Sequence, residues 1–403
     1  MSLVTIEQPF VSPETEAQDA GAPIAFHTYL WKIASRCNLN CSYCYVYNRG
    51  DSQWERQPRF MSESVARQTA ARIREHCQAH GKRELSIIFH GGEPLLGGFE
   101  HIDLLTRIIA EEFDGFDGTM CVGMQSNAVL FNEEIGDLLL RRRMTMGVSL
   151  DGPPHINDLH RVDHLGRPSS DALERSLSLL TSDKYRTVLG GFLCVLDLDA
   201  DPVEVTDYLL SWNPPSIDYL FPLDNHDRLP KGKTEDPSAN PYGQWLVKAF
   251  DHWLKSGSRS RIRVFNSIIE LLCGRRSLIE SLGVAPIDLV VVETNGELEG
   301  VDALKTTFNG ACSLGMNVFE HSFDDAARHF AVRSRQMGVA ALCEKCRNCP
   351  IVNVCGSGYV PHRYSQARKF DNPSVYCTDL DLIIRHIHQR LSREVESIAA
   401  VRQ

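Results

Sequence analysis

The stretch SRCNLNCSYCY, residues 35–45, places three cysteines within eight positions and leaves the set one thiol short of four. It follows a run of strand-forming residues, FHTYLWKI (26–33), so the thiols stand on a loop after the first predicted strand. A closed structural zinc site needs four protein ligands. Three thiolates on one loop instead suit three irons of a [4Fe–4S] cluster whose fourth iron is open to an outside ligand. The alternative is a zinc site completed by a distant histidine.

Composition narrows the class of protein. The chain has 403 residues, of which 43% are hydrophobic and 23% charged, so it can bury a large core, and its length predicts one large domain with a smaller one. The net charge of −10 disfavours a nucleic-acid partner, and no apolar run is long enough for a membrane span. The N-terminus has no basic region followed by an apolar stretch, which argues against export. We therefore expect a cytoplasmic protein with neither a nucleic-acid nor a membrane partner.

The thirteen cysteines are unevenly distributed, which indicates metal binding in a compartment that keeps thiols reduced. Four of them stand apart and are expected to be buried small hydrophobic residues: Cys77, Cys121, Cys194 and Cys273. A second cluster lies in CEKCRNCPIVNVC (343–355), and Cys377 follows it. Four thiolates can close a zinc site or hold a fully ligated iron–sulfur cluster, and their spacing alone leaves both open. We favour iron–sulfur because an oxygen-sensitive cluster is already expected in the first loop.

The order of predicted elements indicates the fold class. Between residues 26 and 222, strand-like and helical runs alternate six times, which predicts an α/β fold with a parallel sheet, either doubly wound or an incomplete barrel. Such folds place their active sites at the carboxyl ends of the strands. The polar segment 224–241 is expected to be a linker or surface loop. Asn295-Gly296 between β-forming residues then predicts a hairpin, and an amphipathic helix is expected from about residue 380.

The first cysteine loop resembles that of the radical SAM enzymes, whose open iron binds S-adenosylmethionine. Cys37, Cys41 and Cys44 would hold this cluster. Gly91-Gly92-Glu93-Pro94, after the second predicted strand, is similar to the family's GGEP motif, which implies contact with the amino group of the cofactor. The glycines allow close backbone approach, and the glutamate offers an anionic acceptor. Taken alone, the four residues would more simply be a turn.

Residues at the ends of two further predicted strands resemble cofactor-binding positions of the same family. Ser126-Asn127 closes the third predicted strand and Ser149-Leu150-Asp151-Gly152-Pro153 the fourth, and the resemblance implies that Ser126, Asn127, Ser149 and Asp151 meet the cofactor's carboxylate and ribose. Tyr43 is implied to lie near the adenine. The resemblance implies a partial (β/α)6 TIM barrel. The expected division is an N-terminal extension (1–25), the barrel (26–235), bridging helices and a hairpin (236–340), and an auxiliary-cluster domain with the C-terminal helix (341–403).

The second cysteine cluster resembles the SPASM domain of radical SAM peptide-modifying enzymes. This resemblance assigns one auxiliary [4Fe–4S] cluster to Cys346, Cys349, Cys355 and Cys377. Full SPASM domains carry a second auxiliary cluster, but Val301 and Tyr359 stand where its cysteines are expected, so we expect it to be absent. Cys312 and Cys343 are spare thiols that could build a second site instead.

Asp302 stands where related maturases place a carboxylate facing the substrate. A carboxylate beside a cationic or radical intermediate can accept a proton as a general base. The alternative is an exposed hairpin aspartate without such a role.

Four segments resemble FxsB-like radical SAM/SPASM maturases, some of which form cyclophanes: YVYNRGD (45–51), ETNGELEGVDALK (293–305), HRY (362–364) and FDNPSVYC (370–377). The resemblance implies a ribosomally synthesised precursor peptide whose aromatic ring carbon is joined to a side-chain β-carbon through a 5′-deoxyadenosyl radical. It also implies an electron donor such as flavodoxin or ferredoxin. Because only about 25 residues precede the first strand, a separate leader-recognition protein is a further candidate partner.

Several other activities fit the same scaffold. Thioether formation, epimerisation and sulfatase-type maturation are alternatives, and Cys312 or Cys343 could donate the hydrogen atom that epimerisation needs. Sulfatase-type maturation is less favoured because the ligands of the second auxiliary cluster are missing. A noncatalytic metal scaffold would have no use for an open three-cysteine site together with GGEP.

Overall fold

The computed structural model describes residues 23–277 and 279–401, so most of the expected N-terminal extension lies outside the described residues. One sheet runs in the order β10-β9-β8-β1-β2-β3-β4-β5-β6-β7. Its strands are β1 (Thr28–Ala34), β2 (Glu84–Gly91), β3 (Thr119–Ser126), β4 (Thr145–Ser149), β5 (Leu189–Val195), β6 (Ser216–Leu220), β7 (Arg261–Ile262), β8 (Leu289–Val292), β9 (Glu297–Glu299) and β10 (Ser313–Asn317). The strands from β8 through β1 to β7 pair in parallel, whereas β8, β9 and β10 pair antiparallel.

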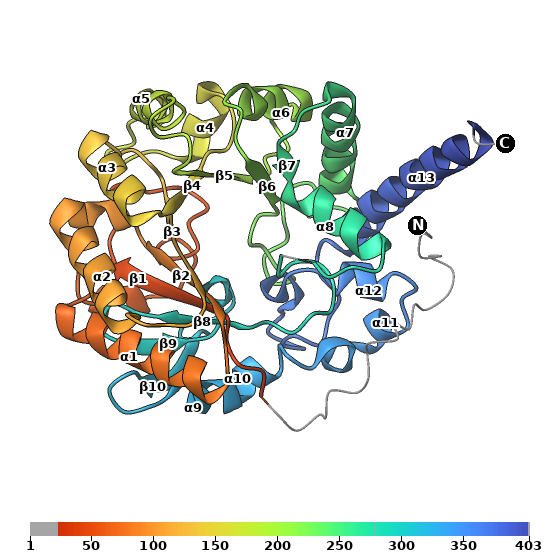
Figure 1. Cartoon of the computed structure of the whole chain (residues 1–403). Helices are drawn as coiled ribbons and strands as arrows, with labels where there is room; N and C mark the ends of the chain where they lie inside the picture. Colours follow the sequence, from red (N-terminus) through yellow and green to blue (C-terminus); the bar gives the residue numbers. More distant parts are fainter. Residues whose placement is uncertain (1–22, 278, 402–403) are drawn as a thin grey trace.

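Helices cover the outer side of the curved sheet, and the strands surround the middle of the molecule (Figure 1). They are α1 (Glu63–Ala79), α2 (Gly98–Glu112), α3 (Glu133–Arg142), α4 (Pro154–His160), α5 (Ser170–Leu180), α6 (Pro202–Ser211), α7 (Pro241–Ser256) and α8 (Arg263–Leu272). This arrangement confirms the α/β class. The sequential order of β1 to β6, each followed by a helix, is the order expected of a partial barrel.

The rest of the chain is built from short elements and one long helix. They are η3 (Asp302–Thr306), α9 (Phe323–Arg328), α10 (Phe330–Arg333), α11 (Glu344–Arg347), α12 (Val352–Cys355) and α13 (Cys377–Val401). The predicted hairpin forms, because β8 and β9 pair antiparallel around Gly296, whose φ is +85°. No helix in the described part of the chain is long and apolar enough to cross a membrane.

Sequence patterns explain the elements that hold the first loop. The Trp31 side chain of β1 pairs in register with Phe89 of β2, and their ring centroids lie 6.0 Å apart with both side chains fully buried. Burial of such a ring stabilises the fold by roughly 1.5–3 kcal/mol. Ser62 caps the N-terminus of α1, and its side chain accepts a hydrogen bond from the Val65 amide. The end of β1, where the cysteine loop starts, is therefore packed against rigid neighbours.

Two expectations about exposure are wrong. The segment 224–241 is not a surface loop throughout, because Lys233 is fully buried and pairs with Asp379 of α13 at 2.7 Å. Cys77 and Cys194 are buried as expected, but Cys121 is exposed and Cys273 is half-buried. Cys121 lies in the first half of β3, where alternate positions face solvent. The apolar residues around Cys121 in the sequence therefore did not indicate which face of the strand is buried.

Candidate functional site

The three-cysteine loop is shaped by contacts with the protein itself. The Ser35 hydroxyl donates to the Pro58 carbonyl at 2.7 Å. The Arg36 guanidinium lies 5.1 Å from the centre of the Trp54 ring and donates to the Trp54 carbonyl at 2.9 Å. Within the loop, the Cys44 amide donates to the Cys41 carbonyl at 3.0 Å. The backbone that carries the thiols is thus held at the carboxyl end of β1.

The spacing of the thiols fits a cluster better than a single ion. Zinc with four sulfur ligands at 2.3 Å brings each pair of sulfurs to about 3.8 Å. Across the described residues, the one group of three potential ligand atoms that all lie within 4.8 Å is His76, His80 and Asp324, and it contains no cysteine. Both cysteine sets are therefore spread more widely than one zinc ion requires. A [4Fe–4S] cluster, whose irons occupy separate corners, suits such spacing.

Gly91 ends β2 and Gly92 follows it, and both pack too closely against the end of β1 and the cysteine loop for a side chain to fit. The Gly92 amide donates to the Ala34 carbonyl at 2.8 Å, and the Glu93 amide donates to the Arg36 carbonyl at 2.9 Å. A Cβ atom on Gly92 would lie 1.9 Å from the Tyr47 hydroxyl. The GGEP segment is therefore in direct contact with the loop, as its proposed part in the cofactor site requires.

Glu93 joins the ends of β2 and β3. Its carboxylate is fully buried and accepts hydrogen bonds from the Ser126 hydroxyl at 2.7 Å, the Asn127 amide at 2.8 Å and the Leu95 amide at 2.9 Å. Burial raises the pKa of Glu93, and these hydrogen bonds oppose the rise. The Asn127 side chain also donates to the Asn38 side chain at 2.9 Å. An ammonium group that approached Glu93 would find one oxygen, Oε2, with a single hydrogen bond already made.

Tyr43 and Asp151 form a buried network with Arg161. The Tyr43 hydroxyl donates to Asp151 and accepts from the Arg161 guanidinium at 2.8 Å. The other oxygen of Asp151 accepts from the Val195 amide at 2.9 Å. Arg161 is 6% exposed, and its Nε atom has no hydrogen-bond partner among the described residues. Nearby, the Ser149 hydroxyl accepts from the Gln125 side chain at 3.0 Å.

Sequence reasoning missed Arg161. It caps the C-terminal end of α4, a helix that the sequence pattern did not predict, and it belongs to no motif. Its buried guanidinium makes it a candidate to bind an anionic group at this strand end.

Asp302 is buried against the cysteine loop and is not an exposed hairpin residue. It begins η3, three residues after the end of β9, and is 8% exposed. The Tyr45 hydroxyl donates to its carboxylate at 2.6 Å, and the Lys32 ammonium lies 3.4 Å away. Burial acts to raise the pKa of Asp302, but the charge of Lys32, His90 and the Tyr45 hydrogen bond lower it to about 2. Asp302 is therefore ionised at neutral pH.

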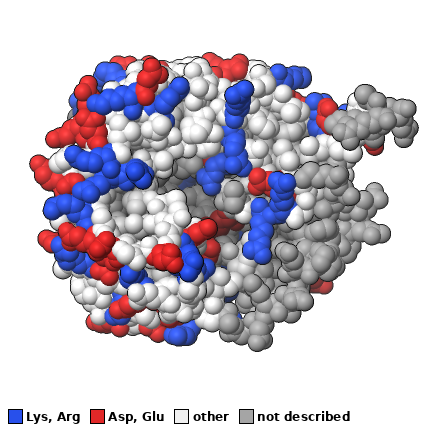
Figure 2. Space-filling view, in the orientation of Figure 1, with Lys and Arg blue, Asp and Glu red and all other residues white. Residues whose placement is uncertain are grey.

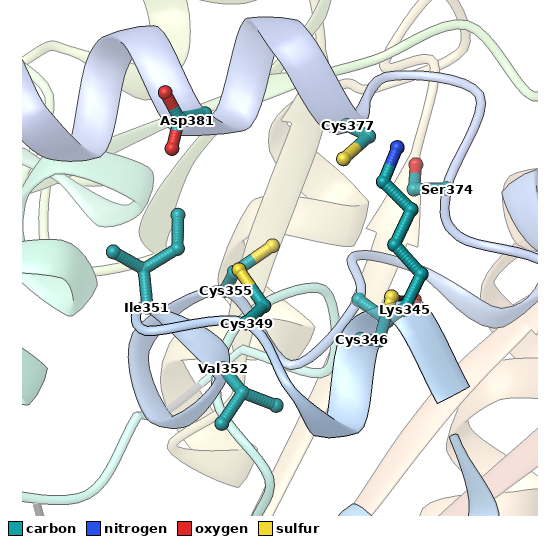
Figure 3. Close-up of a pocket in the computed structure, with 10 residues that line it drawn as sticks. Lys345, Cys346, Cys349, Ile351, Val352, Cys355, Ser374, Cys377 and Asp381 are labelled. Carbon is teal, nitrogen blue, oxygen red and sulfur yellow. Dashed lines mark hydrogen bonds between the residues drawn. The ribbon is translucent and has the colours of Figure 1, made fainter. Parts of the chain in front are cut away.

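The second cysteine set converges on one cavity of about 240 Å³. Figure 3 shows that its thiols come from α11, the following loop, α12 and the first residue of α13, and they are Cys346, Cys349, Cys355 and Cys377. Lys345, Ser374 and Asp381 also line it. Four thiols around one space are the ligand set of a fully ligated cluster.

The two spare cysteines take no part in this cavity. Cys343 is buried beside it but does not line it. The Cys312 thiol is also buried and donates to the Val301 and Asp302 carbonyls at 3.3 and 3.4 Å. Beside Gly300, Glu280 and Arg335 form an ion pair at 2.6 Å.

The FDNPSVYC segment lines the auxiliary cavity through Ser374 and Cys377, and the HRY segment supports the chain beside it. Arg363 donates to the carbonyls of Gly356, Ser357 and Gly358, at 2.6, 3.0 and 2.7 Å, and so fixes the loop after Cys355. The Asn372 side chain donates to the Arg363 carbonyl at 2.9 Å. These segments therefore position the auxiliary thiols.

The His76, His80 and Asp324 group is a hydrogen-bonded cluster. The Phe26 amide donates to Nε2 of His76 at 3.1 Å, which places the proton of the neutral ring on Nδ1. Nδ1 lies 2.8 Å from Asp324 and is thus a donor there. A metal ion would require that nitrogen to be unprotonated.

In the view of Figure 1, the face over the strands is hollowed near its centre, and basic and acidic side chains alternate around it (Figure 2).

Comparison with known proteins agrees with this geometry. Residues 31–207 match the family model of the radical SAM superfamily. The chain is 24% identical over 373 residues to the cysteine-type anaerobic sulfatase-maturating enzyme of Clostridium perfringens, which covers 91% of this chain and 97% of that protein. It is 26% identical over 355 residues to the serine-type anaerobic sulfatase-maturating enzyme of Klebsiella aerogenes. The aligned region covers 86% of this chain and 82% of that protein.

Solved structures share the fold. Native anSMEcpe with bound AdoMet has a TM-score of 0.78 and 23% identity, with 92% of this chain and 99% of that chain covered. Streptococcus suis SuiB bound to the precursor peptide SuiA has a TM-score of 0.58 and 14% identity, with 88% and 76% covered. The family match and the relatives bear out an enzyme with a radical SAM mechanism that uses S-adenosylmethionine and [4Fe–4S] clusters.

Proposed function

We propose that this enzyme oxidises a ribosomally synthesised precursor peptide and joins an aromatic ring carbon to a side-chain β-carbon, as its resemblance to FxsB-like maturases implies. The observation that carries the proposal is Asp302, a buried and ionised carboxylate in contact with the residue that follows Cys44. Cross-linking to an aromatic ring releases a ring proton, which a carboxylate so placed can accept.

The residues divide the work as follows. Cys37, Cys41 and Cys44 hold the open cluster, and the GGEP segment with the ends of β3 and β4 holds S-adenosylmethionine. The four auxiliary cysteines hold the second cluster. When bound, these groups supply a hydrogen-abstracting carbon radical and accept one electron.

The peptide loses one hydrogen atom, one proton and one electron as its carbon–carbon bond forms. Asp302 takes the proton at its carboxylate. A flavodoxin or ferredoxin supplies electrons, and a separate protein is proposed to recognise the leader of the peptide.

Sulfatase-type maturation is the second candidate, because the curated relatives named above carry that activity in their names. The same carboxylate would then accept the proton of a cysteine thiol or serine hydroxyl. An aldehyde would form in place of a cross-link, directly from serine, or from cysteine by way of a thioaldehyde that water hydrolyses with release of hydrogen sulfide.

Anaerobic co-expression with the peptide encoded beside the gene tests the proposal. Tandem mass spectrometry is expected to find a product two hydrogens lighter, which resists fragmentation across a short span containing an aromatic residue. A product that reacts with a carbonyl reagent would support sulfatase-type chemistry instead. Solvent deuterium at an α-carbon, with no other change, would indicate epimerisation and overturn the proposal.

A further inference from the structure

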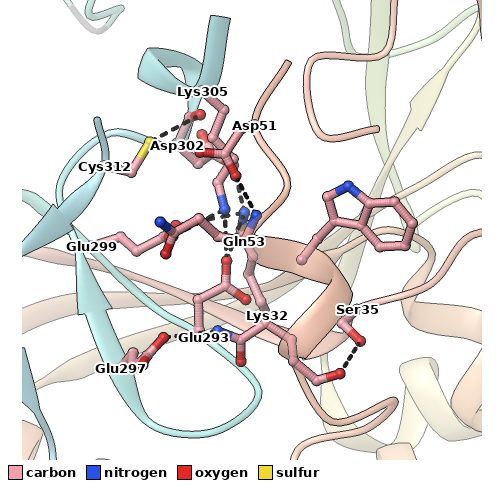
Figure 4. A network of polar contacts seen from close by, with 12 residues as sticks. Lys32, Ser35, Asp51, Gln53, Glu293, Glu297, Glu299, Asp302, Lys305 and Cys312 are labelled. Carbon is pink, nitrogen blue, oxygen red and sulfur yellow. Dashed lines mark hydrogen bonds and ion pairs between the residues drawn. The ribbon is translucent and has the colours of Figure 1, made fainter. Parts of the chain in front are cut away.

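A buried ion network surrounds Asp302 (Figure 4). It contains two lysines and three carboxylates, each at most 8% exposed, which come from β1, the β8–β9 hairpin and η3: Lys32, Glu293, Glu299, Asp302 and Lys305. Charges buried at this density are costly unless each has a partner of opposite sign. The ion-pair partners of each charged side chain therefore indicate its role.

Lys305 is committed to the two glutamates. Its ammonium donates to Glu293 at 2.9 Å and to Glu299 at 3.0 Å. Burial and the nearby charge of Glu293 raise the pKa of Glu299. Burial acts to raise the pKa of Glu293 as well, but the charges of Lys32 and Lys305 lower it. Glu293 is therefore the carboxylate that stays ionised and attracts a second cation.

Lys32 supplies that cation and links the glutamates to Asp302. Its ammonium lies 3.3 Å from Glu293 and 3.4 Å from Asp302. In the part of the chain that the structure describes, it is the one Lys, Arg or His nitrogen within 4.0 Å of the Asp302 carboxylate. Lys32 pairs in register with His90 of β2, so it projects from the same face of the sheet as that residue.

We propose that Lys32 is a positioning residue that keeps Asp302 ionised and oriented, and that the Glu293–Lys305–Glu299 group anchors Lys32 in that position. The inference rests on the proposed function, in which Asp302 acts as the base. Without Lys32, burial would push Asp302 towards the protonated acid, which cannot accept a proton, and the charge of His90, the Tyr45 hydrogen bond and the charge of Lys305 would be left to oppose it.

Infrared spectroscopy of the cluster-containing protein, labelled with ¹³C in its aspartate carboxyls, tests this at pH 6 without any peptide. Each protein, wild type or variant, is compared with the same protein carrying the additional substitution Asp302→Asn. Subtraction of the second spectrum from the first leaves the carboxyl bands of Asp302. The wild type is expected to show no protonated-acid band from Asp302. Lys32→Met is expected to show the protonated-acid band of Asp302. Lys32→Met/Glu293→Gln should show the same band. Because this second variant removes one positive and one negative charge together, it guards against misfolding caused by an unpaired glutamate.

Lys305→Met is the matched control, because it removes the same charge from the same network without touching Asp302. It is expected to leave Asp302 ionised. An ionised Asp302 in Lys32→Met/Glu293→Gln, or equal protonation in Lys305→Met, would overturn the proposal. The infrared experiment contains no peptide, so its result tests only the role of Lys32. An unmodified peptide in the co-expression experiment would count against the proposed function and not against the role of Lys32.

Discussion

The Tyr45 hydroxyl donates a 2.6 Å hydrogen bond to Asp302, which lies 257 positions later in the chain. Tyr45 directly follows Cys44, so this bond ties the η3 segment to the loop proposed to hold the open cluster. The residue next to the proposed ligand Cys44 thereby helps to position the proposed base.

Replacement of the base should separate radical formation from product formation. In Asp302→Asn, we expect peptide modification to fall by about 10²–10⁴-fold, because general-base catalysis contributes roughly that much. Cleavage of S-adenosylmethionine should continue, since Asp302 makes no contact with the three cysteines. Chromatography of 5′-deoxyadenosine and modified peptide in one assay measures both. Equal loss of the two products would contradict the assigned role.

Gly92→Ala tests the packing of GGEP against the cysteine loop. The new methyl group would meet the Tyr47 hydroxyl at 1.9 Å and the Arg36 carbonyl at 2.4 Å. We expect the loop to shift, with a stability loss of about 1–3 kcal/mol and depletion of iron from the first site. Gly300→Ala is the control, because its nearest neighbour lies 3.8 Å away. Normal iron content in Gly92→Ala would show that the close approach is not needed.

The auxiliary site can be tested by iron analysis. Cys377→Ala removes one of four cavity thiols, and the anaerobically reconstituted protein should fall from about eight to about four irons per chain. Cys121→Ala, an exposed cysteine outside both sets, should retain the full complement. Zinc in place of iron at the auxiliary site of the wild type would refute the cluster assignment.

The buried pair of Lys233 and Asp379 should matter for stability. Lys233→Met leaves the Asp379 carboxylate unpaired two residues after Cys377, at an expected cost of about 3–5 kcal/mol. The double variant Lys233→Met/Asp379→Asn should recover much of this loss, because no unpaired charge remains. Urea denaturation of the wild type, Lys233→Met, Asp379→Asn and the double variant measures the free energy of unfolding, and additive losses in the double variant would contradict the explanation.

Acid should destabilise the fold through His76. Burial lowers its pKa from 6.5 to about 4, although Asp324 opposes the shift. As pH falls, the unfolded chain binds a proton at His76 before the folded chain does. The contribution of neutral His76 to the free energy of unfolding is therefore complete above about pH 6.5 and is lost towards pH 4, by up to about 3 kcal/mol. In His76→Gln, the pH dependence in this window should flatten. His155→Gln, at an exposed position, should leave it unchanged.

The sequence predicted those features that local patterns encode. Alternation of strands and helices indicated the α/β class, and the Asn295-Gly296 turn indicated the hairpin. The two cysteine sets were visible from their spacing, and the structure brings the four auxiliary thiols to one cavity. Gly92 had to be glycine for a reason that the motif suggested, close backbone approach.

Features that depend on tertiary contacts were not predictable. Lys32 sits in an apolar strand run and gave no sign of its partners, which lie more than 260 residues away in the chain. Arg161 and Lys233 appeared to be ordinary polar residues of loops, yet both are buried. Long-range charge pairing leaves no periodicity in the sequence, so only the folded chain reveals it.

The most direct test of the central claim is an isotope transfer. The peptide encoded beside the gene, deuterated at its side-chain β-carbons, is incubated anaerobically with the reconstituted enzyme, reductant and S-adenosylmethionine. The account predicts deuterium in 5′-deoxyadenosine, detected by mass spectrometry, together with a cross-linked peptide. Formation of 5′-deoxyadenosine without deuterium, beside an unmodified peptide, would contradict it.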